Sequence, residues 1–529
     1  MSSTRTAAPP VPSPEPERPP DGRLRLRRPV PTAALAALAA VVTIALRLIA
    51  VDRSGDIFVD ELIYTELGRS AGEGGFPRTD EGLFFLHPPG FFYLQAAWLG
   101  LIGFDGDALA EVHAVRVLNA LLAGATAALL VLLVARVRSR TAGVLAGLVF
   151  AFDQYCIRQN NRALLETETM VWVLAGYLVL VPPARGDPRR ARGRAVLAGF
   201  LFGMAILTKD HSALITLLPL LAAVALNWGP PRRLLALTIA TAVVPYTVYV
   251  TFVRGFGHFD DFWYAKTMGV QRLLGIVQET GFNAPGSPSL AGRLTAQLPD
   301  YTISYVLLLL APVALVLLLR RKDPVHRLLA LFHASAIVTL LYAVTVGTLE
   351  EQALYLLFVP TLVALAVTMP LPRRSPGRTR TVAGLSAVAL ACVVLVPAAV
   401  YAKERGEADD GFVRLRSYVT QHLPQGTPIS TVDGGTSLGV THYALQDRYR
   451  TGHWVTDDDR LAQGVQYLVV PWKVIQQGYG ASSLAEVRRL TERGELLFSF
   501  DGEMYGTLAL YRIPLPDVTG PAAGPGGGP

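Results

Sequence analysis

An acidic pair, Asp60-Glu61, follows a few residues after the first long apolar segment of the chain. A carboxylate can accept the proton of an attacking hydroxyl, which makes it a candidate general base. The alternative is structural, because acidic residues also cap helices and favour the first helical turn. The pair lies at the edge of an apolar segment, which is where chemistry on a membrane surface is expected.

Cationic side chains recur in short polar turns between later apolar segments. The candidates are Arg158, Arg162, Lys209 and His211. Lys209 stands out because lysine is scarce in this chain beside arginine. Fixed cations of this kind can stabilise the negative charge of a phosphate group. The alternative is that these side chains extend to lipid headgroups and hold no ligand.

The elements that must position these residues are membrane helices. Of the 529 residues, 51% are hydrophobic and 17% charged, and the mean hydropathy is +0.37. These values are typical of a polytopic membrane protein and exclude an ordinary soluble domain. A helix needs roughly 20 apolar residues to cross a bilayer, and about eleven segments approach that length. They lie near residues 31–51, 113–135, 141–157, 164–183, 195–208, 211–228, 234–253, 302–319, 327–347, 352–369 and 380–401.

Arginine clusters recur after every second apolar segment. They lie at residues 23–28, 136–140, 185–194, 232–233, 320–327 and 373–380. Because short cytoplasmic loops are enriched in Lys and Arg, this pattern places the N-terminus in the cytoplasm. The net charge of +7 then faces anionic lipid headgroups, and no nucleic acid partner is expected.

The recurrence of arginine clusters after every second apolar segment also decides whether two ambiguous segments cross the membrane. Residues 90–104 are apolar, but a span there would place every later arginine cluster outside. We therefore predict an interfacial helix in a long outer loop over residues 52–112. The stretch 195–228 is predicted to be a hairpin that turns outward at 209–211, since a single span would also invert the later loops.

Composition divides the chain into four parts. Residues 1–30 are predicted to be a disordered basic cytoplasmic tail, and residues 31–403 a membrane domain. Residues 404–516 alternate short β-rich and helical runs, which is typical of a small α/β domain, here outside the membrane. Residues 517–529 form a Gly/Pro tail that is expected to be disordered. The expected fold class is thus an α-helical polytopic membrane protein with about eleven transmembrane helices and an extracytoplasmic α/β domain.

A further outer loop, residues 254–301, combines aromatic and charged side chains. It carries His258, Asp260, Asp261, Trp263, Tyr264 and Lys266. Aromatic rings beside carboxylates can stack on sugars and hydrogen-bond to them, but interfacial Trp and Tyr are also common membrane anchors. The sequence leaves both interpretations open.

Five short motifs occur in order along the chain. They are Asp60-Glu61-Leu-Ile-Tyr64, His87-Pro-Pro-Gly90, Arg116-Val-Leu-Asn119, Arg162-Ala-Leu-Leu-Glu166 and Leu207-Thr-Lys209. Across residues 31–370 this set resembles the GT-C glycosyltransferases, and most of all the branch of protein O-mannosyltransferases and the lipid A aminoarabinose transferase. The resemblance implies a sugar donor on a polyprenyl monophosphate, inverting transfer, an active site on the extracytoplasmic face, and no nucleotide sugar.

The resemblance also suggests roles for single residues. Asp60 matches the acidic position expected to act as the base, and Glu61 is expected to orient a partner or the acceptor. The donor phosphate is expected against Arg158, Arg162, Lys209 and His211. Substrate contacts are expected from Tyr64, His87, Glu166 and Tyr355, although His87 can instead fix its own loop. One departure is that Ala353 and Leu354 stand where the family has a cation.

No cofactor is expected. Asp60, Glu61, His87 and Glu166 could converge on a divalent metal, but no single outer element shows a metal-binding spacing. The acidic run 457–459 is more typical of a solvated turn. The expected partners are the lipid-phosphate sugar donor, an extracytoplasmic acceptor (a protein, a lipid or a cell-wall glycan) and the bilayer.

A transporter or flippase of lipid-linked sugars is the alternative function. Transporters place ionisable groups near the bilayer midplane and often contain repeats with interrupted helices. Here the ionisable residues gather at one face and no internal repeat is visible. These features favour the transferase.

Overall fold

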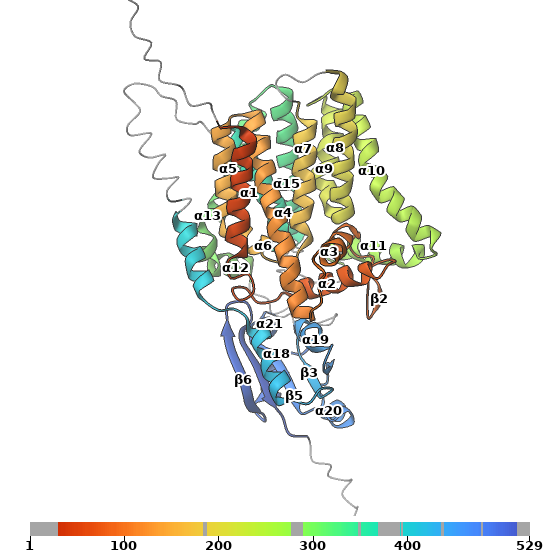
Figure 1. Ribbon diagram of the computed structural model, residues 1–529, viewed down its shortest axis with the longest axis vertical. Coiled ribbons are helices and arrows are strands. Elements are labelled where there is room, and N and C mark those ends of the chain that lie inside the picture. The colour runs from red at the N-terminus through yellow and green to blue at the C-terminus, as the bar shows by residue number, and fades with distance from the viewer. Residues whose placement is uncertain are drawn as a thin grey trace, which may run out of the picture.

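The computed structural model describes residues 30–182, 188–276, 289–346, 351–368, 392, 395–434, 439–477 and 480–515. The predicted terminal tails lie outside these ranges, apart from residue 30, as does most of the apolar segment 380–401. Figure 1 shows a bundle of helices and, at one end of it, a smaller domain of strands and helices.

Apolar helices lie side by side in the bundle (Figure 1). They are α1 (Thr32–Leu48), α4 (Ala108–Val137), α5 (Arg140–Phe152), α6 (Gln154–Asn160), α7 (Leu165–Leu180), α8 (Ala191–Thr208), α9 (Ala213–Leu226), α10 (Arg232–Gly255), α13 (Leu298–Leu309), α14 (Ala311–Leu319), α15 (Pro324–Val346) and α16 (Ala353–Thr368). Their inward faces share one large apolar core. Large apolar side chains such as Val244 and Leu309 also cover outward faces, as expected where lipid replaces water.

Five helical segments are long and apolar enough to cross a bilayer alone, and the bent pair α6–α7 raises this number to six. α1, α5, α9 and α16 are apolar but shorter, between 10 and 17 residues. The expected architecture of several apolar membrane helices is therefore present. The described ranges do not establish the predicted number of eleven.

The basic turns meet at the end of the bundle opposite the strands (Figure 1). Arg140 donates to the Val30 carbonyl at 3.2 Å, which places the turn between α4 and α5 beside the start of α1. The Arg327 guanidinium lies 5.4 Å from the Trp228 ring, which joins the turn between α9 and α10 to the start of α15. A short 3₁₀ turn, η1 (Pro188–Arg190), precedes α8. These basic turns therefore share one end of the bundle.

Short elements cover the other end of the bundle (Figure 1). They are α2 (Val59–Gly72), β1 (Arg78–Thr79), β2 (Gly82–Leu83), α3 (Gly90–Ile102), η2 (Asp210–Ser212), α11 (Phe259–Leu273) and α12 (Leu290–Ala296). With 13 residues, α3 extends only about 20 Å and is too short to cross a bilayer. α8 and α9 form a hairpin that turns at η2, which confirms the prediction for residues 195–228.

The smaller domain contains a five-stranded mixed sheet in the order β4-β3-β5-β7-β6. Its elements are α18 (Gly411–His422), β3 (Pro428–Thr431), α19 (Val440–Leu445), β4 (Arg450–Gly452), α20 (Asp457–Gln463), β5 (Tyr467–Pro471), α21 (Trp472–Gln476), α22 (Leu484–Thr491), β6 (Glu495–Gly502) and β7 (Gly506–Arg512). β3 is parallel to β4 and β5, whereas β7 is antiparallel to β5 and β6. Leu468, Val469 and Val470 of the central strand β5 are buried, as expected for a strand covered on both faces.

A buried ion pair between Arg116 and Glu61 attaches the outer loop to the bundle. Their side chains are 3% and 0% exposed. The Arg116 Nε and Nη2 atoms each lie 2.8 Å from a Glu61 oxygen, which is a bidentate pair. Arg116 also donates to the carbonyls of Gly55 at 2.8 Å and Asp56 at 3.0 Å. One side chain of α4 therefore fixes both the start of α2 and the segment before it.

The Glu61 carboxylate also accepts hydrogen bonds from two backbone N–H groups. It accepts from Phe58 at 2.9 Å and from Ala163, in the turn between α6 and α7, at 2.7 Å. Burial alone would raise the pKa of Glu61, but Arg116 and these N–H groups hold it below its usual value. The charged carboxylate thus joins α2, α4 and the α6–α7 turn.

Removing the cation of this pair should destabilise the outer end of the molecule. Arg116→Met leaves the Glu61 charge buried without its partner, and breaking a buried pair in this way costs about 3–5 kcal/mol. We expect thermal unfolding in detergent to show a clearly lowered melting temperature. The matched control is Arg78→Met, which breaks an exposed pair with Glu73 (2.6 Å) worth about 0–1 kcal/mol. Equal melting temperatures of the two variants would contradict the role given to Arg116.

Candidate functional site

The two adjacent carboxylates of α2 have different surroundings. Asp60 is the second residue of the helix and is half-exposed. Glu61 is fully buried, and its carboxylate is engaged by Arg116 and by the N–H groups of Phe58 and Ala163. The sequence predicts that Glu61 orients a partner or the acceptor; the partner is Arg116, and the fully buried carboxylate offers no surface to an acceptor. It holds α2 in place, and Asp60 is the carboxylate of the pair that an incoming group can reach.

One helical turn after Asp60, Tyr64 lies on the same face of α2. Its ring meets the His87 imidazole edge to face, with ring centres 5.8 Å apart, and also contacts Phe92. Tyr64 is 6% exposed, so it packs beneath His87 and offers little surface to a substrate. Asp60 and His87 thus lie along one face of the helix.

The chain turns sharply between α6 and α7, whose axes differ by 109°. The Asn119 side-chain amide donates to the Leu164 carbonyl at 3.0 Å, and Glu61 accepts from the Ala163 N–H. These side chains satisfy backbone groups that are left unpaired where a helix ends. Side chains of α2 and α4 therefore fix this turn, and with it the position of Arg162.

Both arginines near this turn are ion-paired with Glu351. Arg158 lies 3.3 Å and Arg162 3.7 Å from its carboxylate. Burial alone would raise the pKa of Glu351, but the two guanidinium groups hold it below its usual value. Arg162 also covers the Phe58 ring at 5.0 Å, two residues before Asp60. Phosphate binding by these arginines stays a prediction, and Glu351 is a partner that the sequence did not indicate.

A second group of charged side chains, the Lys209 cluster, gathers where η2, α11 and the loop before α3 meet. It consists of His87, Glu166, Lys209, Asp210, His211, Lys266 and Arg272. Lys209 is ion-paired with Glu166, and both side chains are buried. The Lys266 amino group lies 2.6 Å from Asp210 and donates to the Leu86 carbonyl at 3.0 Å. Lys209, Glu166, His87 and His211, which the sequence selected from separate segments, are thus brought together.

The Lys209 cluster carries a net positive formal charge. Burial lowers the pKa of His87 well below its usual value, and Lys209, Lys266, His211 and Arg272 lower it further. Burial and the nearby lysines lower the pKa of His211 to about 4. Both imidazoles are therefore neutral at pH 7, and the three cations of the cluster outnumber its two carboxylates. Such a site suits an anion.

Lys266 and Arg272 are site residues that the sequence did not assign to phosphate. They lie on α11, in the outer loop whose role the sequence left open. Trp263 and Tyr264 of this helix are 63% and 68% exposed, which fits contact with lipid headgroups. Lys266 lies in the cluster instead. The scarcity of lysine, which singled out Lys209, is the signal that could have identified it.

Tyr355 does not face the site. It is fully buried in α16, and its hydroxyl accepts from the Asn160 side-chain amide at 3.1 Å. The Asn160 oxygen in turn accepts from the buried Arg47 at 3.1 Å. Tyr355 therefore supports the end of α6, which corrects the expectation that it binds substrate.

Within the described ranges, no three His, Cys, Asp or Glu side chains are grouped so that they could hold a metal ion. The acidic run 457–459 forms the first turn of α20, where Thr456 caps the helix by accepting from the Asp459 N–H at 3.1 Å. The acidic residues therefore have a structural role in the first turn of a helix.

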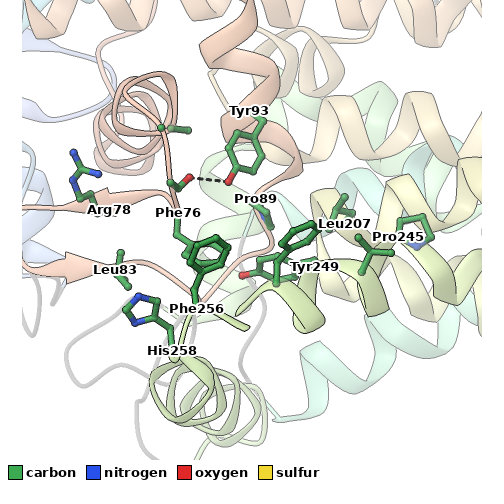
Figure 2. Close-up of a pocket in the computed structure, with 15 residues that line it drawn as sticks. Phe76, Arg78, Leu83, Pro89, Tyr93, Leu207, Pro245, Tyr249, Phe256 and His258 are labelled. Atoms are coloured by element: carbon green, nitrogen blue, oxygen red, sulfur yellow. Dashed lines mark hydrogen bonds between the residues drawn. The ribbon is translucent and has the colours of Figure 1, made fainter. Parts of the chain in front are cut away.

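An apolar groove lies between the outer loop and α10 (Figure 2). Its volume is about 610 Å³, and aromatic side chains dominate its lining, among them Phe76, Tyr93, Tyr249 and Phe256. The Tyr93 hydroxyl donates to the Gly75 carbonyl at 2.8 Å, which ties α3 to the end of α2. The groove offers apolar and aromatic surface with few polar atoms.

The groove has lipid-facing residues at one part of its lining and comes close to the Lys209 cluster at another, where the lining residue Tyr249 is near Asp210. Leu207 and Pro89 both line it, and they lie two residues from Lys209 and His87 respectively. At another part of the lining Phe252 is 58% exposed, on a helix that is long and apolar enough to span a bilayer. An apolar chain that enters there can bring a charged end group to the cluster.

Residues 92–261 match the family model of dolichyl-phosphate-mannose-protein mannosyltransferases. A search of curated protein sequences gives no match. The matched region contains the α6–α7 turn, Lys209 and the start of α11.

Three of the solved structures that are similar to this chain illustrate the likeness. ArnT of Cupriavidus metallidurans, bound to undecaprenyl phosphate, has a TM-score of 0.56 at 14% identity over 90% of this chain and 97% of ArnT. The apo oligosaccharyltransferase of Archaeoglobus fulgidus has a TM-score of 0.57 at 12% identity over 92% and 75%. AglB of the same organism, in complex with an inhibitory peptide and a dolichol-phosphate, has a TM-score of 0.55 at 10% identity over 90% and 74%. The chain therefore has the GT-C fold and is similar to the glycosyltransferases of that superfamily.

Proposed function

We propose that this protein is an inverting glycosyltransferase that moves a sugar from a polyprenyl-monophosphate donor to an acceptor hydroxyl outside the cytoplasm. The observation that carries the proposal is an apolar groove that passes close to the Lys209 cluster, which itself lies beside the face of α2 that bears Asp60. A lipid-phosphate sugar has the same order of parts: an apolar chain, an anion and a sugar. Similar structures hold undecaprenyl phosphate and a dolichol-phosphate.

In this proposal the groove receives the isoprenoid chain and the Lys209 cluster holds the phosphate. The donor phosphate is a diester with one negative charge. It leaves as a monoester and therefore gains charge as the bond to the sugar breaks. Lys209, Lys266 and Arg272 stabilise that developing charge, because fixed cations in a partly buried site need no reorganisation during the reaction.

Asp60 is the proposed general base. Its carboxylate takes the proton of the acceptor hydroxyl while the hydroxyl oxygen forms a bond to the anomeric carbon from the face opposite the phosphate. The bond between that carbon and the phosphate oxygen breaks, and its electron pair leaves with the polyprenyl phosphate. One displacement of this kind inverts the anomeric configuration. The acceptor is a protein, a lipid or a cell-wall glycan.

The orientation in the membrane follows from the basic turns. They share the end of the bundle opposite the Lys209 cluster, and basic turns are enriched on the cytoplasmic side. We therefore assign the N-terminus to the cytoplasm, and the outer loop and the C-terminal α/β domain to the extracytoplasmic side of a cell membrane.

Asp60→Asn should remove the base and keep the shape of the site. We expect release of polyprenyl phosphate from a panel of polyprenyl-phosphate sugars, with an envelope extract as acceptor, to fall by about 10²- to 10⁴-fold. Donor binding should be unchanged. The matched control is Asp52→Asn, an exposed carboxylate of the same loop, which should retain activity. Near-wild-type release of polyprenyl phosphate by correctly folded Asp60→Asn would contradict the assignment of Asp60 as the base. Movement of the intact donor across liposome membranes without bond cleavage would instead favour a transporter.

Lys266→Met should weaken donor binding. A hydrogen bond to a charged group is worth about 1.5–3 kcal/mol, so the dissociation constant for polyprenyl phosphate should rise about 10- to 100-fold. Lys322→Met, an exposed lysine of the turn before α15, serves as the control because it lies at the other end of the bundle. Unchanged affinity in both variants would place the phosphate elsewhere.

Donor affinity should rise as the pH falls from 7 towards 5. His87 and His211 are neutral in the free site because their pKa values are lowered. A bound phosphodiester anion keeps its charge over this range and raises those pKa values, so that binding takes up protons. Each proton taken up can strengthen binding by up to about tenfold per pH unit. Binding titrations with a lipid phosphodiester at several pH values measure the pH dependence of the dissociation constant. An affinity that does not change with pH would show that the imidazoles do not face the anion.

A further inference from the structure

The four residues before α2 have all of their backbone polar groups hydrogen-bonded. The Gly55 and Asp56 carbonyls accept from Arg116, and the Ile57 N–H donates to the Asp56 side chain at 2.8 Å. The Phe58 N–H donates to the Glu61 carboxylate, and the Phe58 carbonyl accepts from the Glu61 N–H at 3.0 Å. The remaining three groups are the Gly55 N–H, the Asp56 N–H and the Ile57 carbonyl.

These three groups are paired by residues beyond position 400. The Gly55 N–H donates to the Asp409 carbonyl at 3.3 Å, and the Asp56 N–H donates to the Asp409 carboxylate at 3.4 Å. The Tyr505 hydroxyl donates to the Ile57 carbonyl. The start of α2 is therefore held from two sides, by Arg116 of the bundle and by the C-terminal domain.

Tyr505 is rigidly placed for this contact. It lies at the tip of the hairpin between β6 and β7 and is 5% exposed, with its ring against the Phe412 ring at 5.0 Å. The neighbouring Met504 N–H donates to the Asp409 carboxylate at 3.3 Å. The Lys473 N–H donates to the Tyr505 carbonyl at 3.0 Å. The hairpin tip and Asp409 thus form one hydrogen-bonded unit against the outer loop.

The contact lies close to the proposed base. Ile57 precedes Asp60 by three residues, and its carbonyl belongs to a residue that is 1% exposed. Without the Tyr505 hydroxyl this buried acceptor would be left unpaired, and the segment would move to find another donor. A shift of about 1 Å at a catalytic group can cost about 10²-fold in rate.

We infer that Tyr505 and Asp409 are positioning residues for transfer, through which the C-terminal domain fixes the first turn of α2 and the placement of Asp60. The inference rests on the proposed function, in which Asp60 is the base. It gives the C-terminal domain a part in the reaction centre itself. The domain and the bundle would then have to dock before the enzyme can act.

Tyr505→Phe in the full-length protein tests the inference, because it removes the hydroxyl and keeps the ring. We expect kcat for release of polyprenyl phosphate to fall about 10- to 100-fold, with KM for the donor within about twofold of wild type. Amide hydrogen exchange in peptides that cover residues 55–62 should become faster. The control is Tyr418→Phe. The Tyr418 ring stacks on His422 at the C-terminal end of α18, so this variant should change neither kcat nor the rate of hydrogen exchange.

The readouts separate positioning from simple stabilisation. A merely structural tyrosine would lower the melting temperature and the yield of folded protein but leave kcat per folded molecule unchanged, and that result would overturn the inference. If Tyr505→Phe does not fold, Asp409→Asn replaces it, since an amide offers one acceptor oxygen to the Asp56 and Met504 N–H groups. A smaller fall in kcat is then expected, and an unchanged kcat counts against the inference.

Failure of the proposed function would be recognised separately. If wild-type protein releases no carrier from any donor, the transferase proposal fails whatever the variants do. Hydrogen exchange at residues 55–62 still measures whether Tyr505 fixes the start of α2. Unchanged exchange in Tyr505→Phe would refute the positioning role by itself.

Discussion

The ion pair between Glu61 and Arg116 is the interaction on which the outer end of this protein depends. It is buried, bidentate, and surrounded by backbone groups that both partners hold. Such a pair is tolerated in an apolar interior only when each charge is compensated and each remaining lone pair is used. Here that requirement links α2, α4 and the α6–α7 turn. The outer loop is thereby fixed, and Asp60 occupies the adjacent position with its carboxylate accessible.

Neutralised cations are a recurring feature of the candidate site. Lys209 is paired with Glu166, Lys266 with Asp210, and both arginines of the α6–α7 region with Glu351. Pairing keeps these side chains in defined positions and lowers the cost of burying them before a ligand arrives. A phosphate can then share cations that are already oriented. The two histidines of the cluster are neutral at pH 7, because burial and the nearby cations lower their pKa values.

Several features were predictable because they depend on local sequence. Hydropathy indicated the membrane helices, and the parity of the arginine clusters predicted the α8–α9 hairpin and the short helix α3. Asp60 was selected as a carboxylate beside an apolar segment, Lys209 by the scarcity of lysine, and His87 through its motif, which resembles that of the GT-C family. Other assignments failed because residue type does not reveal a partner. Glu61 and Tyr355 are both fully buried, and their partners Arg116 and Asn160 lie 55 and 195 residues away in the chain.

The sequence by itself determined that this is a helical membrane protein with its arginine-rich turns at one end and the candidate site residues at the other. Periodicity and charge carry that information, because the bilayer acts on each segment separately. Only the tertiary structure decided which charges meet. Lys266 joins Lys209, and Tyr505 reaches the segment before Asp60 from 448 residues further along the chain. Such contacts depend on how distant segments pack, and packing is a property of the whole fold that no local pattern records.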